Sequence, residues 1–492
     1  MNKVLYLIKK IIVLGYGIFT ILTVLLYAYT SFYARPTGDD LGFSYRAHRT
    51  WEETHSVTST LKSTIEEAAY QRDACASDYT MVIFVSLMPE VFQPWTFWIA
   101  CWFIVFCLVF SIFVFFKEIL INRFHMPLWF AFLLGCMGIL LILQEMPSTY
   151  SGMYWYSGAI HYPFAFSMSL IFATVSSRYL RNEKEINLII LCLLAVIIGG
   201  DGYFATIFLF SSFFFILLYG VLKKEKRVFR LFLPYIVLLC CCVFCIAGEG
   251  PSKIRTNGKL TISLGLAFNT IIDSIGKSLK LGCSWIVEKF FIIPCVLVLI
   301  CVFLFGVEWE NVKFEFKKPG LVVLSLFLIY ASVYSPWIYS EFFDEFGASM
   351  GPENYCFYTF VLFILFSLVY VFGYFKKKYV DVFPGMIGNT LGIGILVVCL
   401  VCAYQNRHAI KITHGYVGME YILSGSANDY KNQCEENMEI LLNPNIQNVE
   451  LIPTNSFQGL LCNMVATEDP NSFTSLVYSE FYGKESVIMV VE

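Results

Sequence analysis

Long apolar runs recur from the N-terminus to about residue 404 and are separated by short polar connections. A helix that crosses a membrane needs about 20 mainly apolar residues, which is the length of most of these runs. The runs predict about eleven transmembrane helices, at residues 11–29, 95–116, 126–143, 163–180, 186–199, 204–222, 229–247, 284–307, 320–340, 356–375 and 382–404. We therefore expect an α-helical polytopic membrane domain over residues 1–404.

The composition points to the same class of protein. The chain has 492 residues, of which 58% are hydrophobic and 14% are charged. Soluble domains are about 45–50% apolar and about 25% charged, so a chain with so little charge cannot cover its own surface in water. The net charge of −3 shows no basic excess, and nucleic acid is not an expected partner. The expected environment is a lipid bilayer.

Lysine and arginine indicate how the chain is oriented, because basic connections stay on the cytoplasmic side of a membrane. These residues gather before the first run and in every second connection, at positions 3, 9, 10, 117, 123, 178, 181, 184, 223, 224, 226, 227, 230, 313, 317, 318, 376, 377 and 378. The N-terminus is then inside and the C-terminus outside. Three large polar pieces fall outside, at residues 30–94, 248–283 and 405–492.

The last of these pieces, residues 405–492, is less hydrophobic than the rest of the chain. Short β-like runs at 449–452 and 486–491 flank a helical pattern at 472–481. We expect a small α/β cap there, outside the cytoplasm. Cys434 and Cys462 both lie in this piece, where an oxidising exterior would allow a disulfide bond between them.

The sharpest polar feature is Asp39-Asp40, which ends the sequence Arg-Pro-Thr-Gly-Asp-Asp after the first apolar run. Two adjacent carboxylates repel each other and lose solvation near lipid, so a membrane surface is a costly place for them without a role. Neighbouring side chains point in different directions, which lets one carboxylate face a reaction centre while the other is held in place. A solvated turn, which Pro-x-Gly-Asp sequences also form, explains the pair equally well.

A second polar feature lies in the connection 144–162, which is rich in tyrosine and tryptophan. Tyr154, Trp155 and Tyr156 are typical of an aromatic belt at the level of lipid headgroups, and such rings also stack on sugars. A belt does not explain the two ionisable residues that flank the rings, which are Glu145 and His161. We therefore treat these five residues as candidates for a substrate site.

Two further outer connections carry candidate groups. Residues 197–203 form a glycine-rich turn with one acid, Asp201, although a plain hairpin turn explains the glycines as well. Lys253 and Arg255 follow the seventh run, and cations near a membrane surface suit a phosphate group. Residues 264–280 have the spacing of an amphipathic helix, which either lies in the membrane interface or packs against the bundle.

Together these features resemble the GT-C glycosyltransferases, multi-spanning enzymes that take a sugar from a polyprenyl-phosphate carrier outside the membrane. The resemblance rests on the acidic pair in a long first outer segment, an interfacial helix in a later one and a soluble C-terminal region. The chain is still more similar to an uncharacterised group of bacterial GT-C-like membrane proteins. That similarity is carried by Asp39-Asp40, Tyr154-Trp155 with Gly158 and Tyr162, Pro251 with Arg255, and Asp469-Pro470 with Phe473 and Tyr482-Gly483.

The resemblance implies an inverting sugar transfer on the outer face of a bacterial cytoplasmic membrane. One carboxylate, that of Asp39 or Asp40, takes the proton from the acceptor hydroxyl, which is worth roughly 10²- to 10⁴-fold in rate. Arg255 and Lys253 meet the charge of the departing polyprenyl phosphate, and His161 is a weaker candidate for the same role.

The resemblance also implies the partners of the reaction. The donor is a polyprenyl-phosphate-linked sugar, and the acceptor is a cell-surface glycan or a lipid. Some relatives hold a divalent cation at the acidic pair. Oxygen ligands from Asp39, Asp40 and Asp201 would suit Mg²⁺ or Mn²⁺, although no residue pattern in the chain demands a metal.

Two other functions stay open. A polysaccharide polymerase or ligase shares the location and uses arginine and histidine in long outer segments, and the first outer segment contains Arg46, His48, Arg49, His55 and Arg72. A transporter or flippase for lipid-linked sugars should place ionisable groups near the bilayer midplane and often has internal repeats. The predicted helices are almost free of charge at mid-depth and show no repeat, so glycosyl transfer ranks first.

Overall fold

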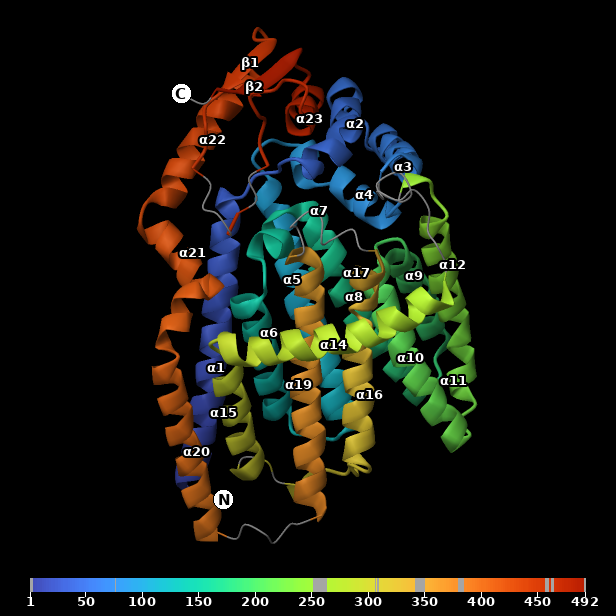
Figure 1. Cartoon of the computed structure of the whole chain (residues 1–492), viewed down its shortest axis with the longest axis vertical. Coiled ribbons are helices and arrows are strands. Elements are labelled where there is room, and N and C mark those ends of the chain that lie inside the picture. Colours follow the sequence, from blue (N-terminus) through green and yellow to red (C-terminus); the bar gives the residue numbers. More distant parts are fainter. Residues whose placement is uncertain are drawn as a thin grey trace.

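The computed structural model describes residues 3–75, 77–250, 263–305, 307, 309–340, 350–378, 385–455, 460–461 and 464–490. In these ranges the chain is almost entirely helical, and the long helices run side by side along the longest dimension of the molecule (Figure 1). The N-terminus lies at one end of this bundle, and the strands near the C-terminus lie at the other (Figure 1).

Eight helices of the described residues are long and apolar enough to cross a membrane. They are Tyr6–Tyr33, Phe97–Arg123, Leu128–Glu145, Tyr156–Asn182, Tyr203–Lys223, Arg227–Ile246, Pro319–Tyr339 and Gly351–Lys378. These spans contain α1 (Lys3–Thr30), α5 (Phe97–Phe116), α6 (Leu128–Glu145), α8 (Ala165–Asn182), α10 (Tyr203–Lys223), α11 (Arg227–Arg230), α12 (Phe232–Ile246), α16 (Pro319–Ser332), α17 (Ser335–Ser340) and α19 (Met350–Lys378). The protein is therefore an α-helical, multi-pass membrane protein.

The three remaining predicted spans are not among these eight helices. Helix α9 (Glu185–Gly199) is a shorter apolar helix, and α20 (Gly385–Gln405) packs against α15 (Ile292–Phe305). The run 284–307 is divided, because α14 (Leu264–Glu288) turns by 85° before α15 begins. This bent pair makes a ninth crossing if it counts as one span. The total of eleven stays a prediction.

Helix α14 lies across the long helices and includes the segment 264–280 that was predicted to be amphipathic (Figure 1). Its buried stripe is small and polar, since Thr270, Ser274, Ser278 and Gly282 recur at every fourth residue. Small side chains allow close packing, and the hydroxyl of Tyr330 in α16 donates a hydrogen bond to the carbonyl oxygen of Ser278 at 3.0 Å. Several large apolar side chains of α14 are exposed, namely Leu264, Phe268, Ile271, Ile272 and Leu279, whereas Trp285 is buried. Helix α14 thus packs on the bundle through one stripe and leaves an apolar face for lipid.

The C-terminal part contains the predicted strands and helix. β1 (Asn448–Leu451) pairs in parallel with β2 (Ser486–Met489), with Val449 opposite Val487, and α23 (Phe473–Tyr482) precedes β2. Helix α21 (His414–Leu423) packs against α1 and leads into α22 (Ser426–Leu442). Cys462 lies outside the described residues, so its predicted pairing with Cys434 stays a prediction.

The C-terminal part also packs on the first outer segment. That segment forms α2 (Asp39–Thr54), α3 (Val57–Ala74) and α4 (Tyr79–Ser86), and α23 contacts α2. The imidazole of His48 in α2 stacks on the ring of Phe481 in α23, with 4.1 Å between the ring centroids. We call the end of the bundle with α2, α3, α4, α23 and the sheet the cap end, and the opposite end, where the N-terminus lies, the basic end (Figure 1).

Candidate functional site

Asp39 and Asp40 form the first turn of α2 at the cap end. The residue before them, Gly38, has a φ of +49°, and a Cβ there would lie 2.9 Å from the Cβ of Met464. Only glycine fits both requirements, because other residues rarely adopt this conformation. The start of a helix has unpaired N–H groups and a partial positive charge, which favour carboxylates. The local backbone therefore explains why the pair follows a glycine.

Asp40 is completely buried, and its carboxylate is held by the segment that follows α6. Its Oδ1 accepts hydrogen bonds from the backbone N–H of Ser157 at 2.8 Å and from the Ser157 hydroxyl at 2.7 Å. Its Oδ2 accepts a hydrogen bond from the N–H of Tyr156 at 3.3 Å. Burial raises the pKa of Asp40 to about 7, and these hydrogen bonds oppose the rise. Asp40 thus joins α2 to α7 (Tyr156–Ala159).

Asp39 has a different environment. Its side chain is only partly buried and accepts no hydrogen bond from the part of the chain that the structure describes. Burial raises the pKa of Asp39, and nearby His161 opposes this rise. Asp39 is therefore the member of the pair whose carboxylate is open to a reaction partner.

His161 lies between two further carboxylates. Its Nδ1 is 2.8 Å from the carbonyl oxygen of Asp201 and 3.5 Å from Oδ1 of the same residue, and its Nε2 is 4.0 Å from Oδ2 of Asp78. Among the described residues, Oδ2 of Asp201 and Oδ1 of Asp78 are buried without a hydrogen-bond partner. Burial raises the pKa of both acids, that of Asp201 to about 6, and His161 opposes the rise in each case.

A glycine turn brings Asp78 next to Asp201. A Cβ on Gly200 would lie only 2.1 Å from Cζ of Tyr79, so glycine is needed for α4 to approach the end of α9. The N–H of Thr80 donates a hydrogen bond to the carbonyl oxygen of Gly200 at 2.9 Å. Asp78 is not among the site residues predicted from the sequence, although an aspartate directly before an apolar run is a signal for a helix start.

The predicted outer loop 144–162 is helical and packed instead of exposed. It contains two π-helical turns, η4 (Tyr150–Tyr154) and η5 (Ile160–Phe164), with α7 between them. Tyr154 and Tyr156 are buried, and Tyr154 stacks on Tyr27 with 6.2 Å between the ring centroids. Trp155 lies over Gly158, where a Cβ would come within 2.5 Å of the indole ring. Packing therefore accounts for the Tyr-Trp-x-x-Gly spacing.

Glu145 has a contact of its own. Its Oε1 accepts a hydrogen bond from the backbone N–H of Phe291 at 2.8 Å, in the bend between α14 and α15. No hydrogen bond or ion pair within the described ranges joins Glu145 to Asp39 or His161. Glu145 therefore stabilises the bend.

The other predicted groups either lie outside the described residues or have partners of their own. Lys253 and Arg255 lie outside the described residues, so their contact with a phosphate stays a prediction. Among the residues that the structure describes, no group of three or more His, Cys, Asp or Glu side chains is arranged to hold a metal ion. Asp40 and Asp201, which were considered as ligands together with Asp39, have separate partners in Ser157 and His161.

The candidate site is thus an acidic cluster at the cap end, made of Asp39 in α2, Asp78 before α4, His161 in η5 and Asp201 between α9 and α10. Comparisons with protein-family models, with curated proteins and with solved structures find no match for this chain. A proposal for the function therefore rests on the acidic cluster and on its position at the end of the membrane helices.

Proposed function

We propose that this protein is a GT-C-like glycosyltransferase that moves a sugar, with inversion, from a polyprenyl-phosphate donor to a cell-surface glycan or lipid. In this proposal the membrane is a bacterial cytoplasmic membrane, and the cap end with its α/β region faces outward. The observation that carries the proposal is the unequal environment of the two adjacent aspartates. Asp40 is bound by three hydrogen bonds, whereas the carboxylate of Asp39 is open.

Asp39 is the general base in this proposal. The acceptor oxygen attacks the anomeric carbon of the donor sugar, and its proton passes to the carboxylate of Asp39. The bond between that carbon and the phosphate oxygen breaks at the same time, and the polyprenyl phosphate leaves with the electron pair. A base works best when its pKa lies nearer to the working pH, and burial moves the pKa of Asp39 upward in that direction.

His161 acts as a positioning residue in this scheme. Its imidazole favours the charged form of Asp39 and is itself held by Asp201 and Asp78. Two carboxylates beside it would repel a phosphate, so we assign the donor phosphate to Lys253 and Arg255 alone. These two precede α14, whose exposed apolar face suits a lipid-linked donor.

A polymerase or ligase is supported less well. Three of the five basic residues considered in the first outer segment have separate partners. Arg46 pairs with Glu67 at 2.7 Å, and Nδ1 of His48 contacts the carbonyl oxygen of Val91 at 2.8 Å. Arg72 pairs with its neighbour in sequence and covers the ring of Phe244.

The proposal is tested by mass spectrometry of surface glycans in a strain that lacks the gene. The strain is rescued with the wild type, with Asp39→Asn, or with Asp429→Asn, which changes an exposed aspartate in α22 as a matched control. At equal amounts in the membrane, we expect the wild type and Asp429→Asn to restore one missing sugar and Asp39→Asn to fail.

Three outcomes would contradict the proposal. Full rescue by Asp39→Asn would show that Asp39 is not the general base. Glycans that become shorter in the deletion strain without a change of composition would favour a polymerase or ligase. Lipid-linked sugar that accumulates on the cytoplasmic side would favour a flippase.

A further inference from the structure

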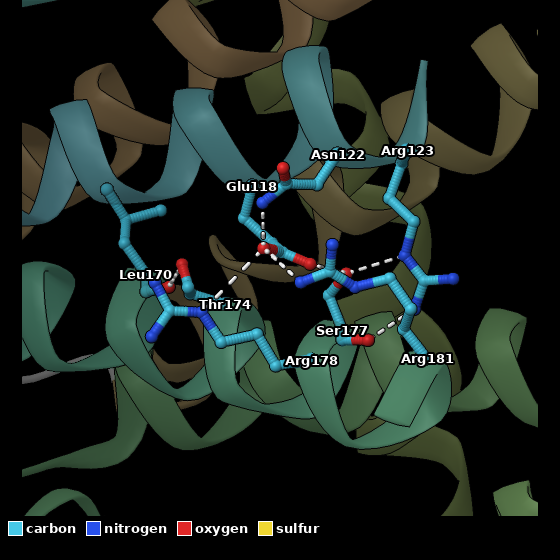
Figure 2. Close-up of polar contacts among 8 residues, drawn as sticks. All are labelled: Glu118, Asn122, Arg123, Leu170, Thr174, Ser177, Arg178 and Arg181. Atoms are coloured by element: carbon cyan, nitrogen blue, oxygen red, sulfur yellow. Dashed lines mark hydrogen bonds and ion pairs between the residues drawn. The ribbon is translucent and has the colours of Figure 1, made fainter. Parts of the chain in front are cut away.

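The basic end contains a second polar cluster, built around a buried acid. Glu118 is 1% exposed and lies in the π-helical turn η3 (Lys117–Arg123), which continues α5. Figure 2 shows the groups that surround its carboxylate, which come from η3 and from the end of α8. Oε2 accepts hydrogen bonds from Asn122 at 2.6 Å and from Arg181 at 3.3 Å, and Oε1 accepts one from Ser177 at 3.2 Å. Nε of Arg178 is 3.7 Å from Oε2.

Ser177 brings a third guanidinium group to the same place. Nε of Arg123 donates a hydrogen bond to the Ser177 hydroxyl at 2.8 Å, and Nη2 donates one to the Ser177 carbonyl oxygen (Figure 2). We call Glu118, Arg123, Ser177, Arg178 and Arg181 the arginine cluster. One carboxylate neutralises one guanidinium, so this cluster keeps a surplus of two positive charges.

Two neighbouring arginines do not share this surplus, because each has its own acid. Nε of Arg227 is 2.7 Å from Oε1 of Glu225, and Nη1 of Arg230 is 2.5 Å from Oε1 of Glu185. In the arginine cluster the side chains of Arg178 and Arg181 are 44% and 35% exposed, so their remaining N–H groups are accessible. Arg178 and Arg181 share the single carboxylate of Glu118 and together keep one accessible surplus charge, whereas Arg123, which is bound by Ser177, carries the other.

The sorting of charges across a membrane accounts for arginines at this end, but it does not require a buried acid that orients them. A buried carboxylate is costly, and a π-helical turn is an uncommon structure that often marks a functional site. A guanidinium group offers several N–H donors in a plane and matches the oxygens of a phosphate. Glu118 holds the guanidinium groups in place before any ligand arrives.

We propose that Arg178 and Arg181 bind the phosphodiester headgroup of an anionic phospholipid in the leaflet at the basic end. Glu118 and Ser177 are positioning residues. The cluster lies where the spans Phe97–Arg123 and Tyr156–Asn182 both end, which is the level of the headgroups. This inference does not depend on the function proposed for the cap end.

The experiment is native mass spectrometry of the purified full-length protein after exposure to vesicles of cardiolipin, phosphatidylglycerol or phosphatidylcholine. We expect the wild type to retain the two anionic lipids in preference to phosphatidylcholine. Each arginine near an anionic lipid contributes about fivefold in affinity, so R178Q/R181Q should bind about thirtyfold more weakly. The matched control R230Q, whose arginine already has Glu185, should bind like the wild type.

Three results would overturn the inference. The first is equal retention of anionic and zwitterionic lipids by the wild type. The second is equal binding by R178Q/R181Q and the wild type. The third is loss of the lipid in the presence of millimolar inorganic pyrophosphate, which would assign the site to a soluble phosphate. If the double variant does not fold, the single variants R178Q and R181Q replace it in this test. Each should bind the anionic lipid about fivefold more weakly than the wild type.

Discussion

The acidic cluster at the cap end and the arginine cluster at the basic end are arranged alike, with opposite charges. In the acidic cluster one imidazole, that of His161, lies among carboxylates. In the arginine cluster one carboxylate, that of Glu118, lies among guanidinium groups. In both places a single residue of the opposite charge orients several side chains, and the surplus charge is left for a ligand. We accordingly propose different chemistry for the two ends, proton transfer at one end and anion binding at the other.

The direction of the helices accounts for the difference in sign. The span Tyr156–Asn182 begins beside the acidic cluster and ends in the arginine cluster. A helix has a partial positive charge at its start and a partial negative charge at its end, so acids are favoured at the start and bases at the end. Helix α5 follows the same rule. At its start, Glu90 accepts hydrogen bonds from the N–H groups of Trp95, Thr96 and Phe97. Beyond its end lies Arg123.

The largest effect on stability is expected at Asp40. Asp40→Ala leaves the backbone N–H groups of Tyr156 and Ser157 buried without partners, at a cost of about 3–5 kcal/mol in the free energy of unfolding. Asp39→Ala removes no hydrogen bond from a described residue and should leave this free energy almost unchanged. Denaturant unfolding of both variants in detergent micelles provides the measurement. Equal losses would mean that the two aspartates do not have separate roles.

A smaller effect is expected at Glu118. Glu118→Ala removes the partner of Arg178 and Arg181 and leaves buried donors of Asn122 and Ser177 unpaired, so we expect a loss of about 2–3 kcal/mol. The matched control is Glu185→Ala, which breaks an exposed ion pair and should not change stability measurably. Thermal unfolding of the two variants under the same conditions compares them. A loss at Glu185 as large as that at Glu118 would contradict the buried role of Glu118.

The third effect, which is at most about 1.4 kcal/mol for each pH unit, is a pH dependence at the acidic cluster. Folding raises the pKa of Asp201 from its ordinary value near 3.8 to about 6, so the folded state binds the proton more tightly than the unfolded state does. This contribution to stability is complete below pH 3.8 and is lost as the pH rises through 6, by at most about 1.4 kcal/mol per pH unit. The measurement is the free energy of unfolding of the wild type minus that of Asp201→Asn, at pH values from 4 to 7. A difference that does not decrease over this range would contradict the burial of the charge.

Patterns that act over a few residues predicted much of the fold. The apolar runs correspond to the observed membrane helices, the amphipathic segment 264–280 lies within α14, and the C-terminal strands and helix fall within a few residues of their predicted places. The run 284–307 was predicted as a single span, because hydropathy alone does not record an 85° bend at its start. The aromatic connection was predicted as a loop, because its π-helical turns are stabilised by packing against α5 and α19, which are distant in sequence.

The acidic pair was visible in the sequence, but the difference between its members was not. Asp40 is bound by residues more than a hundred positions away, and nothing near it in the chain announces that contact. Asp78 enters the site only because Gly200 allows α4 to approach α9. Glu145 accepts a hydrogen bond from Phe291 at the bend between α14 and α15, a contact that no local pattern in the sequence indicates.

By itself, the sequence of this protein determined that the chain enters a membrane, roughly where its helices lie and which residues carry charge. These properties depend on local hydropathy and helical spacing, which act within one helix. The tertiary structure alone decided which aspartate is open, which acids surround His161 and which arginines share one carboxylate. Those properties depend on contacts between helices that are distant in sequence, where burial and hydrogen bonding set whether a charge is satisfied or left for a ligand.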